Sequence, residues 1–370
     1  MTGPSKDYMR RKVWIPLILT CLGAAGLVLY AQAPNETPED FKIIQNVTNI
    51  VVPVGVYDHD DNIVNGLQGR NFHLFDNGKE QDIAVDVNFH PISLVIAIQS
   101  NAAVEKILPQ VRRIGSMLES FVVGDQGEAA VLAFDHRFMV KQDFTNDVNK
   151  ISESLKKITP GSTSSRLVDA CEYGVRMLHN RPPDRRRVLL LISETRDYGS
   201  EGKLREVVIA AQVQNVSVYT VNMSRMIAEM TGKAQQPKVD QMPPANRPMP
   251  SSVPGTPTSV MQMGNSPGNS ADFYPLMIEM LRDVKAVFKD NPAEALTKAT
   301  GGQEFSFVKQ KGLEESIAKI GSELHSQYLI TYSPSNKLEG GFHEIKVTVE
   351  PSHNDWKVRS RPGYWLAATN

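Results

Sequence analysis

The sequence predicts an α/β protein whose core is a doubly wound, mostly parallel sheet, inserted in or flanked by a small antiparallel β domain. The first observation is that near-continuous apolar strands alternate with amphipathic helices from residue 93 to residue 223. The second is that the segments on either side, 42–90 and 328–366, alternate apolar and polar residues in short runs broken by turns. Continuous apolar strands indicate a sheet covered on both faces, whereas alternation indicates a half-exposed antiparallel sheet.

The N-terminal segment, residues 1–33, is predicted to be a signal peptide or a membrane anchor. Basic residues precede the uncharged apolar run 13–30, which is just long enough to span a bilayer. Pro34 directly follows the small residues 31–33 and favours an uncleaved anchor in the cytoplasmic membrane over a released protein. In both cases the rest of the chain is expected on the exported side, periplasmic or extracellular.

Residues 41–90 are predicted to form an N-terminal β unit. Its second half reads as two strands joined by a tight turn through Asp76, Asn77 and Gly78, because an Asn-Gly pair suits the backbone of a two-residue hairpin. The C-terminal strands, 336–366, are expected to pack with this unit.

The α/β domain is predicted over residues 91–335. Its strands are expected at 93–99, 128–135, 137–144, 186–194, 216–223 and 303–308. Its helices are expected at 104–122, 147–158, 165–181, 203–215, 291–302 and 312–327. A segment at 232–272, rich in proline and methionine, interrupts the pattern and is predicted to be a disordered insertion, because it has too few aliphatic residues to offset its ordering entropy.

Composition and motifs argue against several classes of function. The formal net charge of −1 gives no basic field for nucleic acid. No nucleophile elbow, phosphate-binding loop, zinc-protease helix or dinucleotide fingerprint is present, so neither an enzyme nor a small-molecule substrate is expected. Cys171 lies on a core-facing helical stripe and is predicted to be a buried thiol. Asp135 and His136 are predicted to form a solvated turn between two strands.

The order and spacing of several motifs resemble the von Willebrand factor A-like domains, and specifically the exported A-related proteins common in acidobacterial genomes. The resemblance covers roughly residues 40–366. It depends on the following stretches: VVPVGVYDHDDNIVNGL, FHLFDNGKEQDI, PISLVIAIQSN, TPGSTSSRLVDACEYGV, RVLLLISETRDYGS, ATGGQEFSF, SELHSQYLITYSP and KVRSRPGYW.

The resemblance implies a metal-ion-dependent adhesion site at the strand tips, in an altered form. The aspartate of the family's Asp-x-Ser-x-Ser pattern falls on Gln99, and its two serines fall on Asn101 and Ala103. Thr163 matches the threonine, and Glu194 stands where a third-loop aspartate is usual. Hard cations need carboxylate oxygens, so this site is expected to bind no metal and the protein to need no cofactor.

Two functions of different kinds follow from the resemblance. The first is a non-enzymatic interaction or adhesion module that binds a protein or cell-envelope partner without metal, through a rim at the strand tips. Its rim comprises Gln99, Asn101, Ala103, Ser162, Thr163, Glu194, Arg196 and Asp197. The second is a metal-dependent adhesion or assembly factor that holds Mg²⁺, Mn²⁺ or Ca²⁺ through Thr163, Glu194 and Asp197. A purely architectural domain stays open as a third interpretation.

Overall fold

The computed structural model describes residues 49–86, 90–118, 126–231, 291–336, 341–350 and 356–366. All of them belong to one compact unit, Val47–Asn370. The predictions made for 1–33, with its apolar run 13–30, and for the insertion at 232–272 lie outside the described residues. Among the helices that the structure describes, none combines the length and the apolar character needed to cross a membrane.

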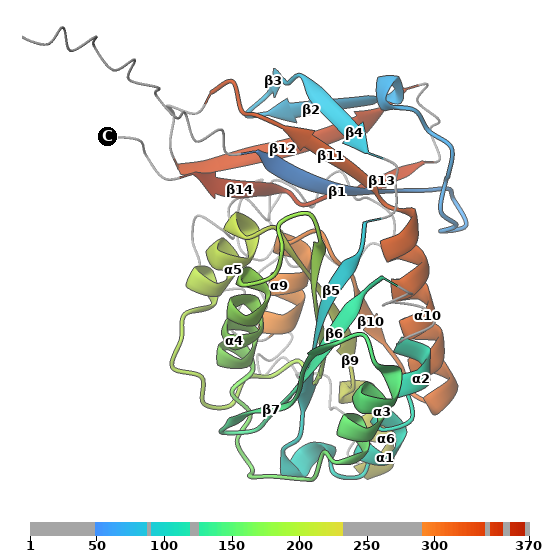
Figure 1. The fold of residues 1–370 in the computed structure, drawn as a ribbon, viewed down its shortest axis with the longest axis vertical. Coiled ribbons are helices and arrows are strands. Elements are labelled where there is room, and N and C mark those ends of the chain that lie inside the picture. Colours follow the sequence, from blue (N-terminus) through green and yellow to red (C-terminus); the bar gives the residue numbers. More distant parts are fainter. Residues whose placement is uncertain are drawn as a thin grey trace, which may run out of the picture. The chain divides into compact units, whose positions relative to one another are not determined.

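A six-stranded sheet with the order β10-β9-β8-β5-β6-β7 forms the centre of the α/β domain (Figure 1). All neighbouring strands are parallel except β7, which is antiparallel to β6. The strands are β5 (Ile92–Gln99), β6 (Glu128–Phe134), β7 (Phe138–Thr145), β8 (Arg186–Ser193), β9 (Val216–Asn222) and β10 (Glu304–Ser306). Every residue of β5 is buried, which explains its near-continuous apolar sequence: helices cover both faces of the sheet.

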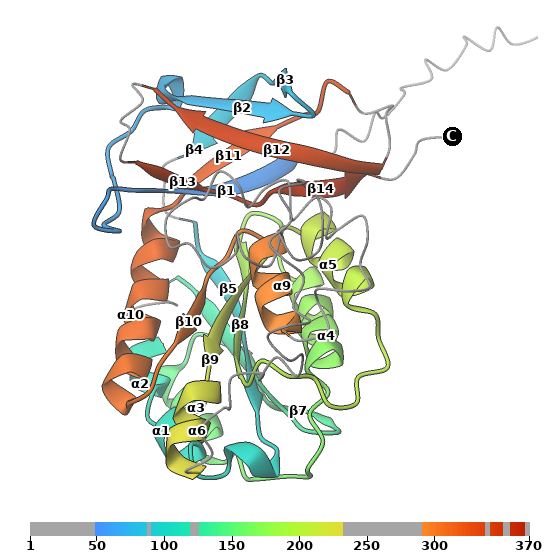
Figure 2. The ribbon, with the colours of Figure 1, turned by 180° about the vertical axis from the view of Figure 1, so that it is seen from behind.

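Each face of the sheet has its own hydrophobic core. On one face lie η2 (Ala102–Val104), α1 (Leu108–Val111), α2 (Gly115–Leu118), α3 (Val148–Lys156), α6 (Ser224–Thr231) and α10 (Gln310–Ser326). On the other face lie α4 (Leu167–His179), α5 (Leu204–Val213) and α9 (Pro292–Ala299) (Figure 2). Cys171 of α4 is fully buried in the second core, as predicted, and this burial raises the pKa of its thiol.

The long helix predicted over 104–122 is wrong as a single element. The structure has three short helical segments instead, and the described part ends at Leu118. Pro109 lies in the first turn of α1 and lacks the N–H that would continue a preceding helix. The apolar positions of the pattern, Val104, Ile107 and Leu108 among them, are nevertheless buried. The helical spacing therefore predicted the buried face correctly but missed the break.

Two four-stranded antiparallel sheets form a separate β domain, with orders β13-β1-β11-β4 and β14-β12-β2-β3. Their strands are β1 (Ile50–Tyr57), β2 (Phe72–Asp76), β3 (Lys79–Glu80), β4 (Ile83–Asp86), β11 (Tyr328–Tyr332), β12 (Gly341–Val349), β13 (Lys357–Arg359) and β14 (Gly363–Leu366); a short helical turn, η1 (Gly69–Asn71), precedes β2. Both sheets contain strands from before and from after the α/β domain. These alternate in the first sheet, where β1 pairs with β11, and meet at one boundary in the second, where β2 pairs with β12. A third hydrophobic core fills the space between the sheets.

The predicted fold class is confirmed: a mostly parallel α/β sheet is accompanied by a small antiparallel β domain. The boundary predicted at residue 335 falls after β11, a strand that the structure places in the β domain. The hairpin predicted at 76–78 is also present, because Asn77 and Gly78 have positive φ angles and β2 pairs with β3.

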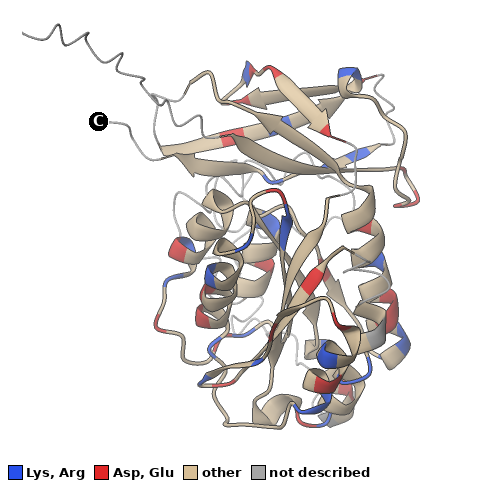
Figure 3. Ribbon diagram, viewed as in Figure 1, with Lys and Arg blue, Asp and Glu red and all other residues tan. Residues whose placement is uncertain are grey.

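The β domain contacts the amino-terminal end of the α/β sheet. Arg359 of β13 forms an ion pair with Glu323 of α10, and Arg361 donates from Nη1 to the carbonyl oxygen of Gln212, 3.1 Å away, just before β9. Arg205 of α5 stacks over the Trp365 ring of β14. The carboxyl ends of the strands, where α/β proteins place their ligands, therefore lie at the other end of the sheet. Figure 3 shows acidic and basic residues interspersed along the helices of this domain.

Candidate functional site

The tips of β5 and β8 are joined by side-chain hydrogen bonds. Gln99 Nε2 donates to Asn101 Oδ1 at 2.9 Å and to Glu194 Oε1 at 2.8 Å, while the Glu194 N–H donates to Gln99 Oε1 at 2.8 Å. Gln99 and Asn101 are almost completely buried. The structure therefore brings together three of the predicted site residues, but it places the two amides beneath the surface.

The side-chain amide of Gln99 donates two hydrogen bonds to other side chains of this cluster. Both bonds from Nε2 end on oxygens, Asn101 Oδ1 and Glu194 Oε1, that a bound cation would otherwise attract. Burial raises the pKa of Glu194, and the Gln99 hydrogen bond together with the nearby Arg196 charge offsets part of that effect. The cluster thus has one carboxylate, that of Glu194, and this group already accepts a hydrogen bond from the Gln99 side-chain amide. This donor set does not fit a divalent cation, which needs carboxylates and no opposing N–H groups.

Asp197 caps helix α4 with its carboxylate. Its carboxylate accepts from the N–H groups of Leu167 and Val168, at 2.7 and 3.3 Å, at the start of the helix. It also accepts from the hydroxyl and the N–H of Ser200, at 2.6 and 3.2 Å. Three of these bonds end on Oδ1 and one on Oδ2, and a negative charge is stabilised at a helix N-terminus. The altered metal site proposed for Thr163, Glu194 and Asp197 would have to compete with these bonds for the carboxylate.

Asp135 positions the loop that carries Thr163. The sequence-based interpretation of Asp135 as part of a solvated turn is wrong, because its side chain is 0% exposed, whereas the neighbouring His136 is 49% exposed. The carboxylate accepts from the N–H of Ser162 at 3.0 Å and from the N–H of Arg137 at 2.7 Å. A Cβ atom at Gly161 would lie 2.1 Å from Asp135 Oδ2, so only glycine allows this approach.

We expect Asp135→Asn to lower the free energy of unfolding by about 2 kcal/mol near neutral pH. Burial alone would raise the Asp135 pKa, but the hydrogen bonds from Ser162 and Arg137 outweigh it and hold the pKa at about 2, below the usual 3.8. The folded-state value is the lower one, so this stabilisation is present above the usual pKa and is lost as the pH falls towards about 2. Urea unfolding of both proteins across this range measures it, and a difference that persists unchanged at the lowest pH would contradict the role of the charge.

The exposed surface above the buried cluster differs in part from the predicted rim. Ala103, Thr163 and Arg196 are exposed, whereas Ser162, Glu194 and Asp197 are half-buried. The loop of Thr163 is fixed from below, because Asn101 Nδ2 donates to the Thr163 carbonyl oxygen at 3.4 Å and the Ala102 N–H donates to the Ser162 carbonyl oxygen at 2.8 Å. These contacts make Thr163 the exposed centre of a fixed loop.

Two further residues belong to this surface, and the sequence-based prediction missed both. Arg137 has 58% of its side chain exposed, and Tyr198 is 46% exposed. Tyr198 is held beside the Thr163 loop by a backbone bridge to Ser165, and its hydroxyl lies 3.4 Å from Arg196 Nη1. Tyr198 follows the end of the predicted strand 186–194 by four positions, which is the signal that could have found it, whereas Arg137 was predicted as the first residue of the strand 137–144. We define the rim from here on as Arg137, Thr163, Arg196 and Tyr198.

The architecture is an α/β fold accompanied by a β domain, as the resemblance to von Willebrand factor A-like domains predicted. The six-stranded mostly parallel sheet has helices on both faces and loops gathered at the carboxyl ends of its strands. No protein-family model and no curated protein matches the sequence.

Several solved structures are similar to this chain. One is an aerotolerance-related membrane protein from Bacteroides fragilis, 12% identical over 63% of this chain and 99% of that one, with a TM-score of 0.39. Another is BatB from Bacteroides thetaiotaomicron, 16% identical over 62% of this chain and 99% of that one, with a TM-score of 0.37. The domain of the pili tip protein Mfa5 from Porphyromonas gingivalis is 14% identical over 30% and 40% of the two chains, with a TM-score of 0.26. At such low identities and TM-scores, no residue role transfers from these proteins.

Proposed function

We propose that this chain is a non-enzymatic interaction module that binds a protein partner through the rim, without a metal ion. The observation that carries the proposal is the Gln99 amide, which donates to Asn101 and Glu194 and so satisfies the oxygens that would otherwise face a cation. The loops at the strand tips are therefore fixed by hydrogen bonds within the protein. A partner therefore binds a preformed surface, and no metal ion bridges the two proteins.

The chemistry of the rim suits a partner with carboxylates. Arg137 and Arg196 present guanidinium groups on loops adjacent to Thr163, and Tyr198 adds an exposed aromatic ring. Arginine and tyrosine are enriched among the residues that contribute most to protein–protein binding. Arginine also binds carboxylates in a bidentate geometry. We therefore take the partner to be a protein with an acidic segment.

The exported location belongs to the same proposal. It depends on residues 1–33, where basic residues precede the apolar run 13–30. An anchor there would hold the rim outside the cytoplasmic membrane, where a protein or cell-envelope partner can reach it. Determining the mass of the N-terminal peptide from native membranes tests whether this segment is retained.

The test of the proposed function combines a charge reversal with a metal control. Asn101 is too buried to accept a charged side chain without disturbing the fold, so Arg196→Glu is combined with Tyr198→Ala on the exposed rim. We expect partners that co-purify with the wild type from native membranes to be lost from the double variant, in EDTA as well as in magnesium. Reversal of the exposed Glu201, as Glu201→Arg, serves as the control and should leave them bound.

Two outcomes would contradict the proposal. Partners that remain on the double variant would show that binding occurs elsewhere on the chain. Partners that leave the wild type in EDTA would favour the metal-dependent alternative, as would calorimetric binding of Mg²⁺, Mn²⁺ or Ca²⁺ that Thr163→Ala abolishes.

A further inference from the structure

We propose that the free edge of β10, with the groove beside it, binds an extended peptide that carries a lysine or arginine. This second binding surface is independent of the rim, because it lies along one edge of the sheet and not at the carboxyl ends of the central strands. It is built from α9 and β10, which follow one another in the sequence, and from β13, which comes much later in the chain.

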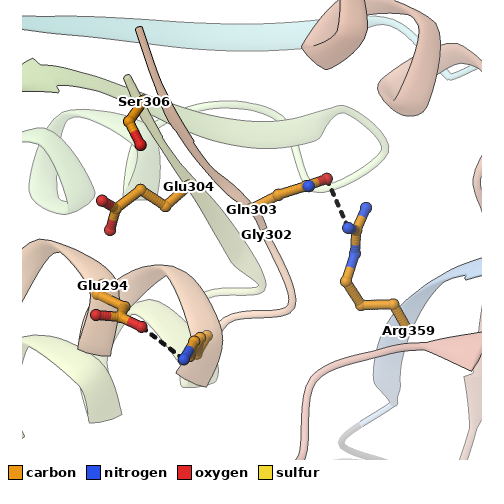
Figure 4. A pocket seen from close by; sticks show the side chains of 7 residues that line it. Glu294, Gly302, Gln303, Glu304, Ser306 and Arg359 are labelled. Atoms are coloured by element: carbon orange, nitrogen blue, oxygen red, sulfur yellow. Dashed lines mark hydrogen bonds and ion pairs between the residues drawn. The ribbon is translucent and has the colours of Figure 1, made fainter. Parts of the chain in front are cut away.

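The groove lies alongside the edge of the sheet. Its volume is about 380 Å³. It is lined from α9 by Glu294 and Lys298, from β10 and the residues before it by Gly302, Gln303, Glu304 and Ser306, and from β13 by Arg359. Successive residues of a strand point to opposite faces of the sheet. Figure 4 shows this alternation, with Glu304 and Ser306 on one side of the strand and Gln303 on the other. Because residues from both faces of the sheet line the groove, the groove runs along the edge of β10 that faces away from β9.

The backbone of β10 offers unused hydrogen-bonding groups to this groove. β10 is the last strand of the sheet and pairs only with β9 within the described chain. The Gln303 carbonyl oxygen accepts from the Thr220 N–H at 3.1 Å, so Gln303 faces β9. In a parallel ladder alternate residues face each neighbour, so the N–H and C=O groups of Glu304 and Ser306 point to the open side. An extended peptide can pair with them as an added strand.

Two carboxylates, Glu294 and Glu304, and two cations, Lys298 and Arg359, line the groove, and Glu304 is the one of the four for which the described residues form no ion pair. The Glu304 carboxylate accepts from two neutral amides, Asn222 Nδ2 at 2.6 Å and Asn291 Nδ2 at 3.4 Å. Burial is the main reason that its pKa is raised, and the charge of Glu294 adds to this effect. The hydrogen bonds from Asn222 and Asn291 and the charge of Lys298 lower the pKa in part. Both cations of the groove are paired with other carboxylates: Lys298 with Glu294, at 2.6 Å, and Arg359 with Glu323. Glu304 itself has no ion-pair partner among the described residues, and a lysine or arginine from the peptide would provide one.

The experiment measures the binding of two synthetic peptides to the full chain by fluorescence anisotropy. The first, Thr-Val-Lys-Val-Thr with blocked ends and a dye, alternates in the pattern of a strand, and the second carries glutamate in place of lysine. We expect the lysine peptide to bind at least about tenfold more tightly, because it alone pairs with Glu304. Glu304→Gln should remove most of that difference.

A matched pair of variants tests the strand pairing. Ser306→Pro removes the outward N–H without disturbing the ladder to β9 and should weaken binding about tenfold, the value of one or two hydrogen bonds. Ser306→Ala removes only the hydroxyl and should bind like the wild type. Equal binding of the two peptides, no detectable binding of either, or full binding by both Glu304→Gln and Ser306→Pro would overturn the proposal. Rim variants should not change the result.

Discussion

Replacement of Asp76 by alanine is expected to lower the free energy of unfolding by about 3–5 kcal/mol. Asp76 is 0% exposed at the end of β2, and its carboxylate accepts hydrogen bonds from both sheets of the β domain. Tyr332 of β11 and Tyr364 of β14 donate their hydroxyls at 2.9 and 2.8 Å, and His343 Nδ1 of β12 lies 2.8 Å away. Removing the carboxylate leaves these three buried groups without their partner.

The same cluster explains how the segments before and after the α/β domain are held together. Burial is the largest reason that the pKa of Tyr332 is raised, followed by the charges of Tyr364 and Asp76, so its hydroxyl stays protonated and keeps donating. Urea unfolding measures the effect of Asp76→Ala. Tyr332→Phe removes one hydrogen bond and should cost about 1 kcal/mol. Asp82→Ala, at an exposed position of the same hairpin, should change the stability by less than about 0.5 kcal/mol. A loss for Asp76→Ala as small as that of Asp82→Ala would contradict the role of the cluster.

The triple variant Gln99→Asp, Asn101→Ser, Ala103→Ser is expected to bind Mg²⁺ at least about 100-fold more tightly than the wild type. The change replaces the amide donor with a carboxylate beside Glu194 and restores the family's spacing of hydroxyls around the exposed Thr163. Without metal, two carboxylates then lie together in a partly buried site, so the melting temperature should fall in EDTA and recover in magnesium. Isothermal titration calorimetry and thermal unfolding measure the two effects.

The controls for this conversion separate charge from loop geometry. Adding Thr163→Ala to the triple variant should weaken the magnesium affinity again, because it removes one oxygen ligand. Gln99→Asn alone keeps an amide and should not create a site. If the triple variant bound magnesium no better than the wild type, the positions of the loops, and not the missing charge, would exclude the ion.

Much of the fold could be predicted from local patterns. Buried strands such as β5 are recognisable because every side chain meets a covering helix, and their apolar runs are therefore nearly continuous. The turn at Asn77 and Gly78 is recognisable because positive φ angles restrict the residue types. The break at Pro109 was missed because the apolar spacing continues across it, although the backbone hydrogen bonds cannot.

The sequence by itself determined the fold class, the strand tips and the residue types found there, because each depends on the residues along one segment. Only the tertiary structure decided what the remaining polar groups do. Gln99 bonds to Glu194 across 95 positions, Asp197 caps a helix that begins 30 residues earlier, and Asp76 joins four strands of two sheets. Hydrogen bonds act over about 3 Å, and which distant residues come that close is set by the packing of the sheets and helices.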